Sequence, residues 1–150
     1  MTETVTRLAD FLPYRISITS NAVSDLIARE YRTRFGLKIP EWRVMAVLGD
    51  VGEATQRELV AATRMDKVAV NRATKALGER ALIQRAPNMR DGRSHHLALT
   101  LAGKALYGEI MPLALQMESQ VLAVLDKDET ALLSALLGKV LRRADALADE

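Results

Sequence analysis

The chain has 150 residues, which suits one domain, and its 49% hydrophobic and 27% charged residues are ordinary for a folded protein. It contains no cysteine, which excludes disulfides, thiolate metal sites and cysteine nucleophiles. No run of about 18 apolar residues occurs, and the first ten residues lack the basic and then apolar order of a signal peptide. We therefore expect a cytoplasmic protein with no membrane partner.

The net charge of +2 is unevenly distributed. Between residues 55 and 93, nine Lys or Arg accompany four Asp or Glu, so this segment carries +5 and the rest of the chain −3. Residues 43–106 contain no aromatic side chain, so they lack the stacking platform of a single-strand binder. The pattern predicts a surface that binds a polyanion, and a chance cluster on a solvated face is the alternative.

Helical spacing dominates the first half of the chain. Apolar residues recur with this spacing over residues 8–36, and Pro40 begins a second helix that Gly49–Gly52 interrupt. Thr55 and Glu58 form a capping box, which predicts a short helix from Thr55 to about residue 63.

Asp66 can cap the next helix, whose two faces differ. One face is apolar and comprises Val70, Ala73 and Leu77. The opposite face is polar and mostly basic, and comprises Val68, Asn71, Arg72, Lys75 and Glu79. We expect that second face to be exposed.

Two short strands follow, at Leu82–Arg85 and His95–Leu101, with turn-forming residues 87–93 between them. A helix–turn–helix followed by a basic hairpin is the pattern of a winged helix. A long helix is then expected over residues 101–125, kinked at Pro112. The last helix carries an apolar stripe too wide for a lone helix in water: Leu132, Leu133, Leu136, Leu137, Val140, Leu141 and Leu147.

Catalytic patterns are missing from the sequence. His95 and His96 are adjacent on a predicted strand and point to opposite faces, so they cannot hold one metal together. Asp126 and Asp128 lie at a helix start, where capping explains them. No phosphate loop, dinucleotide fingerprint, zinc-protease motif or nucleophile elbow occurs. We expect no enzyme activity, catalytic residue, cofactor or metal.

MDKVAVNRATKALGERALIQR, followed by RDGRSHHLALTLAGKAL, resembles the MarR family of bacterial transcriptional regulators. The wing pattern D-x-R is Asp91-Gly92-Arg93, and L-T follows as Leu99-Thr100. IPEWRVMAVL and LPYRISITSNAVSDLI resemble the second and first helices of the family, so the likeness covers residues 8–148. Two positions depart from it: Ala81 replaces a frequent glycine, and Asn71 replaces the commoner Ser or Thr.

The resemblance implies a mainly α fold with a small β-wing. A winged helix-turn-helix lobe would span residues 37–101, and a helical dimerisation region would combine residues 1–36 and 102–150. The implied homodimer intertwines its first and last helices. Its two lobes would bind successive major grooves of a pseudo-palindromic double-stranded operator, with half-sites about 34–36 Å apart or a small multiple of this distance.

The DNA contacts expected from the helix-turn-helix fall into two kinds. Asn71 and Arg72 should reach base edges or phosphates, and at base edges Asn suits adenine and Arg suits guanine. Val68 is either a contact to a thymine methyl or, with equal weight, a core residue. Phosphate contacts are expected from Lys67, Lys75 and Arg57.

The wing should add further contacts. Arg93 is expected in the minor groove and Arg90 also contacts DNA, while Asp91 holds the wing by pairing with a neighbouring arginine. Arg64, Arg80 and Arg85 are interpreted as solvated surface residues.

Members of the family commonly bind small aromatic or phenolic acids, and the matching positions are Tyr14, Arg15, Thr19, Trp42, Met45 and Met111. Arg15 would pair with the ligand carboxylate. Alternatives are open at four positions: Arg15 pairs with an acid of its own dimer, Thr19 bonds its own helix backbone, and Trp42 and Met45 belong to the core.

The sequence therefore favours a sequence-specific DNA-binding transcriptional regulator, a repressor released by a small aromatic effector. An architectural DNA binder without effector or operator preference is the alternative. A winged-helix protein–protein module is a third hypothesis, and the excess positive charge of residues 55–93 argues against it.

Overall fold

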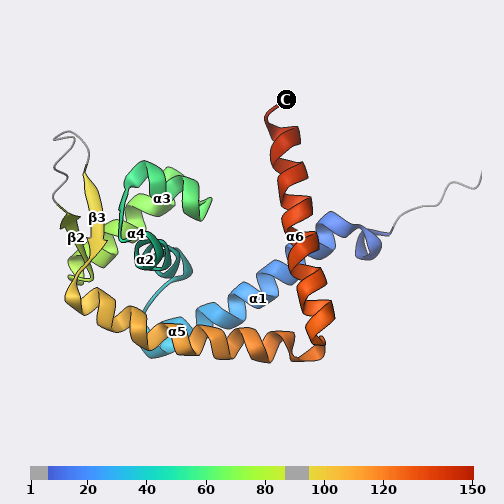
Figure 1. Cartoon of the computed structure of the whole chain (residues 1–150), viewed down its shortest axis with the longest axis horizontal. Helices are drawn as coiled ribbons and strands as arrows, with labels where there is room; N and C mark the ends of the chain where they lie inside the picture. The colour runs from blue at the N-terminus through green and yellow to red at the C-terminus, as the bar shows by residue number, and fades with distance from the viewer. Residues whose placement is uncertain (1–6, 87–94) are drawn as a thin grey trace, which may run out of the picture. The chain divides into compact units, whose positions relative to one another are not determined.

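The computed structural model describes residues 7–86 and 95–150 (Figure 1). Its elements, in chain order, are η1 (Leu8–Asp10), α1 (Leu12–Phe35), α2 (Ile39–Val51), β1 (Glu53–Thr55), α3 (Gln56–Thr63), α4 (Lys67–Glu79), β2 (Ile83–Ala86), β3 (His96–Leu99), α5 (Leu101–Val121), η2 (Leu122–Val124) and α6 (Lys127–Ala148). They form two compact units, Met1–Ala114 and Leu115–Glu150. Among the described residues, no helix combines the length and apolar character needed to cross a membrane.

Three antiparallel strands complete the helical lobe of the first unit. Their order is β1-β3-β2, with Ala54 opposite Leu97 and Gln84 opposite Ala98. Helices α2, α3 and α4 pack on one another, and α2 also packs on β3 (Figure 1). The predicted class, mainly α with a small β-wing in a winged helix-turn-helix lobe, is confirmed. Strand β1 was not predicted, since it is only three residues long and its partner lies about 40 residues away.

The core of this unit joins the end of α1 to the lobe. Tyr31, Met45, Leu59 and Leu77, one from each of the first four α-helices, are almost fully buried. The Tyr31 ring meets Trp42 edge-on at 5.3 Å between ring centroids, and Trp42 stacks on Tyr107 at 5.8 Å. Burial raises the pKa of the Tyr31 hydroxyl. These aromatic contacts tie the C-terminal half of α1 to α2 and α5.

Helix α2 continues through Gly49 and ends at Val51 with Gly52 as its C-cap, so the predicted break within Gly49–Gly52 is confirmed, but it falls at the end of this segment and not at Gly49. The Tyr107 ring lies directly over Gly49, and a Cβ built there would come within 2.6 Å of Tyr107 Cζ. The glycine therefore admits the ring, while its helical hydrogen bonds persist.

The turn between α4 and β2 replaces a frequent glycine with Ala81, which adopts a left-handed φ of +56°. The Thr100 hydroxyl donates to the Ala81 carbonyl at 2.6 Å and accepts from the Gly103 amide at 3.0 Å. A Cβ at Gly103 would collide with the Leu82 carbonyl. The L-T pattern after the wing thus holds this turn against the start of α5.

The second unit contains the end of α5, η2 and α6. Asp126 caps α6 by accepting from the Glu129 amide at 2.8 Å, as its position predicts. Helix α5 continues through Pro112 to Val121. The apolar stripe of α6 is exposed along its whole length, at 38–57% for Leu132, Leu133, Leu136, Leu137, Val140, Leu141 and Leu147.

Candidate nucleic-acid interface

Helix α4 has one face in the core and one face in solvent. Val70, Ala73 and Leu77 are buried, as predicted. Lys67, Asn71, Arg72 and Lys75 are exposed on the other side. Val68 is 58% exposed, so it is not a core residue, and its contact to a thymine methyl stays a prediction.

Hydrogen bonds fix this helix at its N-terminus and on its packed face. Asp66 Oδ1 accepts from the Ala69 amide at 2.7 Å, which confirms the predicted cap. Gln56 Nε2 donates to Thr74 Oγ1 at 2.8 Å, and that hydroxyl donates to the Asn71 carbonyl at 3.1 Å. Thr74 was overlooked in the sequence, although a polar residue four positions after Val70 on an apolar face signals a buried hydrogen bond.

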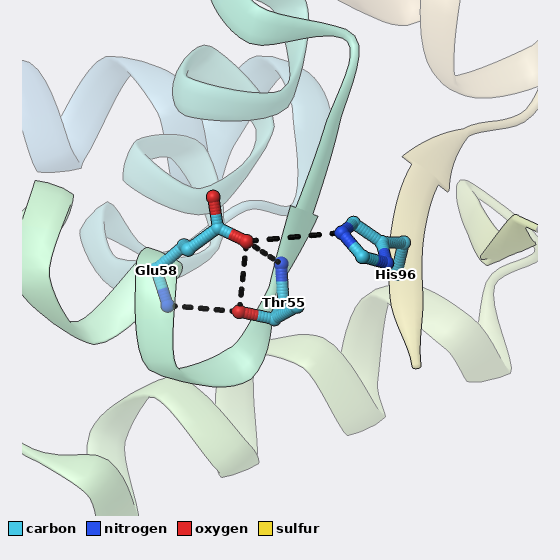
Figure 2. A network of polar contacts seen from close by, with 3 residues as sticks. All are labelled: Thr55, Glu58 and His96. Carbon is cyan, nitrogen blue, oxygen red and sulfur yellow. Dashed lines mark hydrogen bonds and ion pairs between the residues drawn. The ribbon is translucent and has the colours of Figure 1, made fainter. Parts of the chain in front are cut away.

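The N-terminus of α3 is held by the capping box (Figure 2). Glu58 Oε1 accepts from the Thr55 amide at 3.2 Å and from its hydroxyl at 3.0 Å, while the Glu58 amide donates to Thr55 Oγ1 at 3.1 Å. The bonds from the backbone and then the side chain of Thr55 lower the pKa of Glu58, with a smaller contribution from His96. The predicted start of this helix is confirmed.

Strand β3 approaches this cap from the wing side. His96 Nε2 lies 3.8 Å from Glu58 Oε1, and its Nδ1 atom is buried without a hydrogen-bond partner among the described residues (Figure 2). His95 is exposed and lines a cavity of about 350 Å³ with Thr55, Gln56 and Arg57. Arg57 therefore lies in the first turn of α3 and lines this cavity. Its phosphate contact remains a prediction. Within the described ranges, no group of three metal-ligating side chains occurs.

The three wing residues predicted to act on DNA, Arg90, Asp91 and Arg93, lie outside the described residues. Strands β2 and β3 lead to them, and Arg85 on β2 is exposed. Their roles stay predictions.

Arg80 is not the purely solvated residue that the sequence suggested. Its guanidinium donates to the Phe35 carbonyl at 3.0 Å and to the Gly36 carbonyl at 3.3 Å. Sequence reasoning missed this contact because the partners are about 45 positions away and are backbone atoms.

The predicted effector residues lie in different environments. Tyr14, Arg15 and Thr19 are exposed on α1, Trp42 and Met111 are half-buried, and Met45 is fully buried. A cavity of about 430 Å³ lies beside Tyr107, between the end of α2 and the start of α5, and none of these six residues lines it. Their effector role stays a prediction.

Two kinds of sequence comparison place the chain among known regulators. The model of the MarR family matches residues 35–94. The uncharacterized HTH-type transcriptional regulator YwoH of Bacillus subtilis is 31% identical over 105 residues, which cover 69% of this chain and 76% of YwoH. The HTH-type transcriptional repressor NicR of Pseudomonas putida is 30% identical over 97 residues, 65% of this chain but only 61% of NicR.

Solved structures agree with the sequence comparisons. A MarR/EmrR family regulator from Acinetobacter sp. ADP1 has a TM-score of 0.86 at 26% identity, with 94% of this chain and 99% of that chain covered. A mutant of MarR from Escherichia coli, complexed with operator DNA, has a TM-score of 0.78 at 25% identity over 87% of this chain and 93% of that chain. The chain therefore belongs to the MarR family of transcriptional regulators, as the residues of its helix-turn-helix and wing predicted.

Proposed function

We propose that this MarR family protein is a homodimeric, sequence-specific repressor that binds double-stranded DNA and is released by a small aromatic acid. The observation that carries the proposal is the exposed face of α4, with Asn71, Arg72 and Lys75 presented to solvent while Val70 and Leu77 anchor the opposite face. Asn and Arg are the side chains best suited to reading adenine and guanine in a major groove. The E. coli relative of similar fold was solved on its operator.

The dimer is supported by exposed apolar surface on the helices at the two ends of the chain. Helix α6 exposes seven Leu and Val side chains, and α1 exposes Leu12, Ile16, Ile18 and Leu26. Contiguous apolar patches are rare on soluble monomers, because burying them against a partner is favourable. We assign residues 1–36 and 102–150 to dimerisation and residues 37–101 to the DNA-binding lobe.

The DNA proposal is tested by competition. An operator is first selected from random duplexes with the purified protein, and its affinity is then compared with that of a scrambled duplex of equal length. Specific regulators bind their site about 10³–10⁷-fold more tightly than random DNA. Equal affinity for both duplexes would support the alternative, an architectural DNA binder without operator preference.

The effector proposal rests on Arg15, an exposed cation one position after Tyr14 on α1. Salicylate is the first probe, and release of a fluorescent operator is followed by anisotropy. Arg15→Ala should abolish release by salicylate while leaving operator affinity intact, because the carboxylate loses its partner. Arg29→Ala, an exposed cation farther along α1, is the matched control. Loss of the dimer in Arg15→Ala would contradict the assignment, since the arginine would then be structural.

A further inference from the structure

Arg80 connects the ends of two helices that are far apart in the sequence. It is the residue directly after α4, and its guanidinium reaches the carbonyls of Phe35 and Gly36 at the end of α1. Helix α1 otherwise packs mainly on η1 and α2, whereas α4 packs on α2, α3 and β2. The arginine therefore adds a direct link between α1 and α4.

The chemistry of this link is specific to arginine. The last carbonyls of a helix lack intrahelical partners and carry the negative end of the helix dipole. A guanidinium has two separate nitrogens that can bond two neighbouring carbonyls at once, while an ammonium is a single point charge. Gly36, with a φ of +63°, turns the chain immediately after α1 and presents its carbonyl to Arg80.

We propose that Arg80 is a positioning residue for DNA binding, which fixes the end of α4 to the end of α1. The inference rests on the proposed function, in which α1 contributes to the dimer and α4 reads DNA. A fixed joint between them sets where each recognition helix lies relative to its copy. Two linked modules gain affinity for a two-half-site duplex only when their spacing fits the DNA.

The joint is tested first without DNA. The chain has no cysteine, so Ser20→Cys on α1 and Lys75→Cys on α4, both at exposed positions, accept spin labels cleanly. Labelled protein diluted into unlabelled protein gives the distance distribution within one chain. Arg80→Met should broaden or shift this distribution, and Arg80→Lys should restore part of it. Arg43→Met, which removes an exposed cation from α2, should leave it unchanged. A distribution in Arg80→Met as narrow as in the parent protein would overturn the proposal.

The consequence for DNA is tested with the selected operator and with a duplex in which one half-site is scrambled. Arg80→Met should lose at least about tenfold affinity for the full operator and keep its affinity for the half-site, because only the linked binding depends on lobe spacing. Equal losses on both duplexes would overturn the positioning role and make Arg80 a phosphate contact. A parent protein with no preference for the full operator would contradict the proposed function instead, and the label distances would still decide the joint.

Discussion

Helices α4 and α6 are both amphipathic, but they differ in where their apolar residues lie. In α4, Val70 and Leu77 are fully buried, and Ala73 is nearly so, within the same chain. In α6, no residue is buried, and Leu136, Leu137 and Val140 are about half exposed. The apolar face of α4 is therefore covered within its own compact unit, whereas the apolar face of α6 is left open within its own unit.

This difference separates two kinds of functional surface. A helix whose apolar side is satisfied internally can present its polar side to a ligand without unfolding, and α4 presents Asn71, Arg72 and Lys75 in this way. A helix whose apolar side is open has a strong drive to associate, because apolar surface leaves water favourably. The comparison predicts that substitutions in α6 act on assembly, and that substitutions in α4 act on folding or on DNA according to the face.

The largest effect is expected for charges placed on the open face of α6. The double variant Leu133→Glu/Val140→Glu should abolish the dimer, which light scattering measures. Each buried aliphatic side chain contributes about 1.5–3 kcal/mol, and a two-fold interface counts each substitution twice. We therefore expect the dissociation constant to rise by at least about a thousandfold.

Ala135→Glu provides the control for that experiment, since it adds a glutamate, one where the double variant adds two, to the opposite, exposed face of α6. It should leave the dimer intact. A double variant that remains dimeric would show that this face of α6 is not the interface.

The next effect concerns the buried face of α4. Leu77→Ala should destabilise the fold by about 2–5 kcal/mol, because it leaves a cavity at a fully buried position. Urea denaturation followed by circular dichroism measures the change. Glu79→Ala, at an exposed position of the same helix, should stay within about 0.5 kcal/mol of the parent protein. Similar losses for both variants would contradict the two-face description of α4.

The exposed face of α4 should affect DNA and leave folding unchanged. Arg72→Ala should cost about 1–3 kcal/mol per half-site on the operator and relax base preference, as expected for a base contact. Lys75→Ala should weaken all duplexes alike and reduce the salt dependence of binding by about one ion, as expected for a phosphate contact. Binding titrations on operator and random DNA at several salt concentrations measure both. Equal losses on the two duplexes for Arg72→Ala would rule out base reading.

The smallest effect is expected at the cap of α3. The pKa of Glu58 is lowered in the folded protein, first by the Thr55 amide and then by its hydroxyl, so folding favours the ionised form. This contribution is present above the usual pKa of a glutamate and disappears as the pH falls through the lowered value. Glu58→Gln should therefore lower the urea midpoint at neutral pH, and the difference should vanish in acid.

The matched control is Glu79→Gln, an exposed carboxylate outside the capping box. It should change the urea midpoint little at neutral pH, because Glu79 is exposed and takes no part in the cap. A Glu58→Gln difference that persists unchanged in acid would show that hydrogen-bond geometry, and not ionisation, stabilises the cap.

Local features were predictable from the sequence because they depend on residues a few positions apart. The Thr55–Glu58 capping box, the Asp66 cap and the buried face of α4 all follow from spacings of three to seven residues. The family was also predictable, because the helix-turn-helix and wing patterns are contiguous stretches of chain. The exposed face of α4 was identified by the same periodicity.

Contacts between distant residues were decided by the tertiary structure. Strand β1 exists because β3 pairs with it, and a three-residue segment has no periodicity of its own. Gly49 lies inside α2, where its lack of a side chain leaves room for the Tyr107 ring, a contact with a residue 58 positions away that the sequence does not reveal. Arg80 resembles any surface arginine in the sequence, and only the folded chain brings it to the carbonyls of Phe35 and Gly36. Backbone acceptors leave no mark in the sequence, so such a link appears only when both helices are in place.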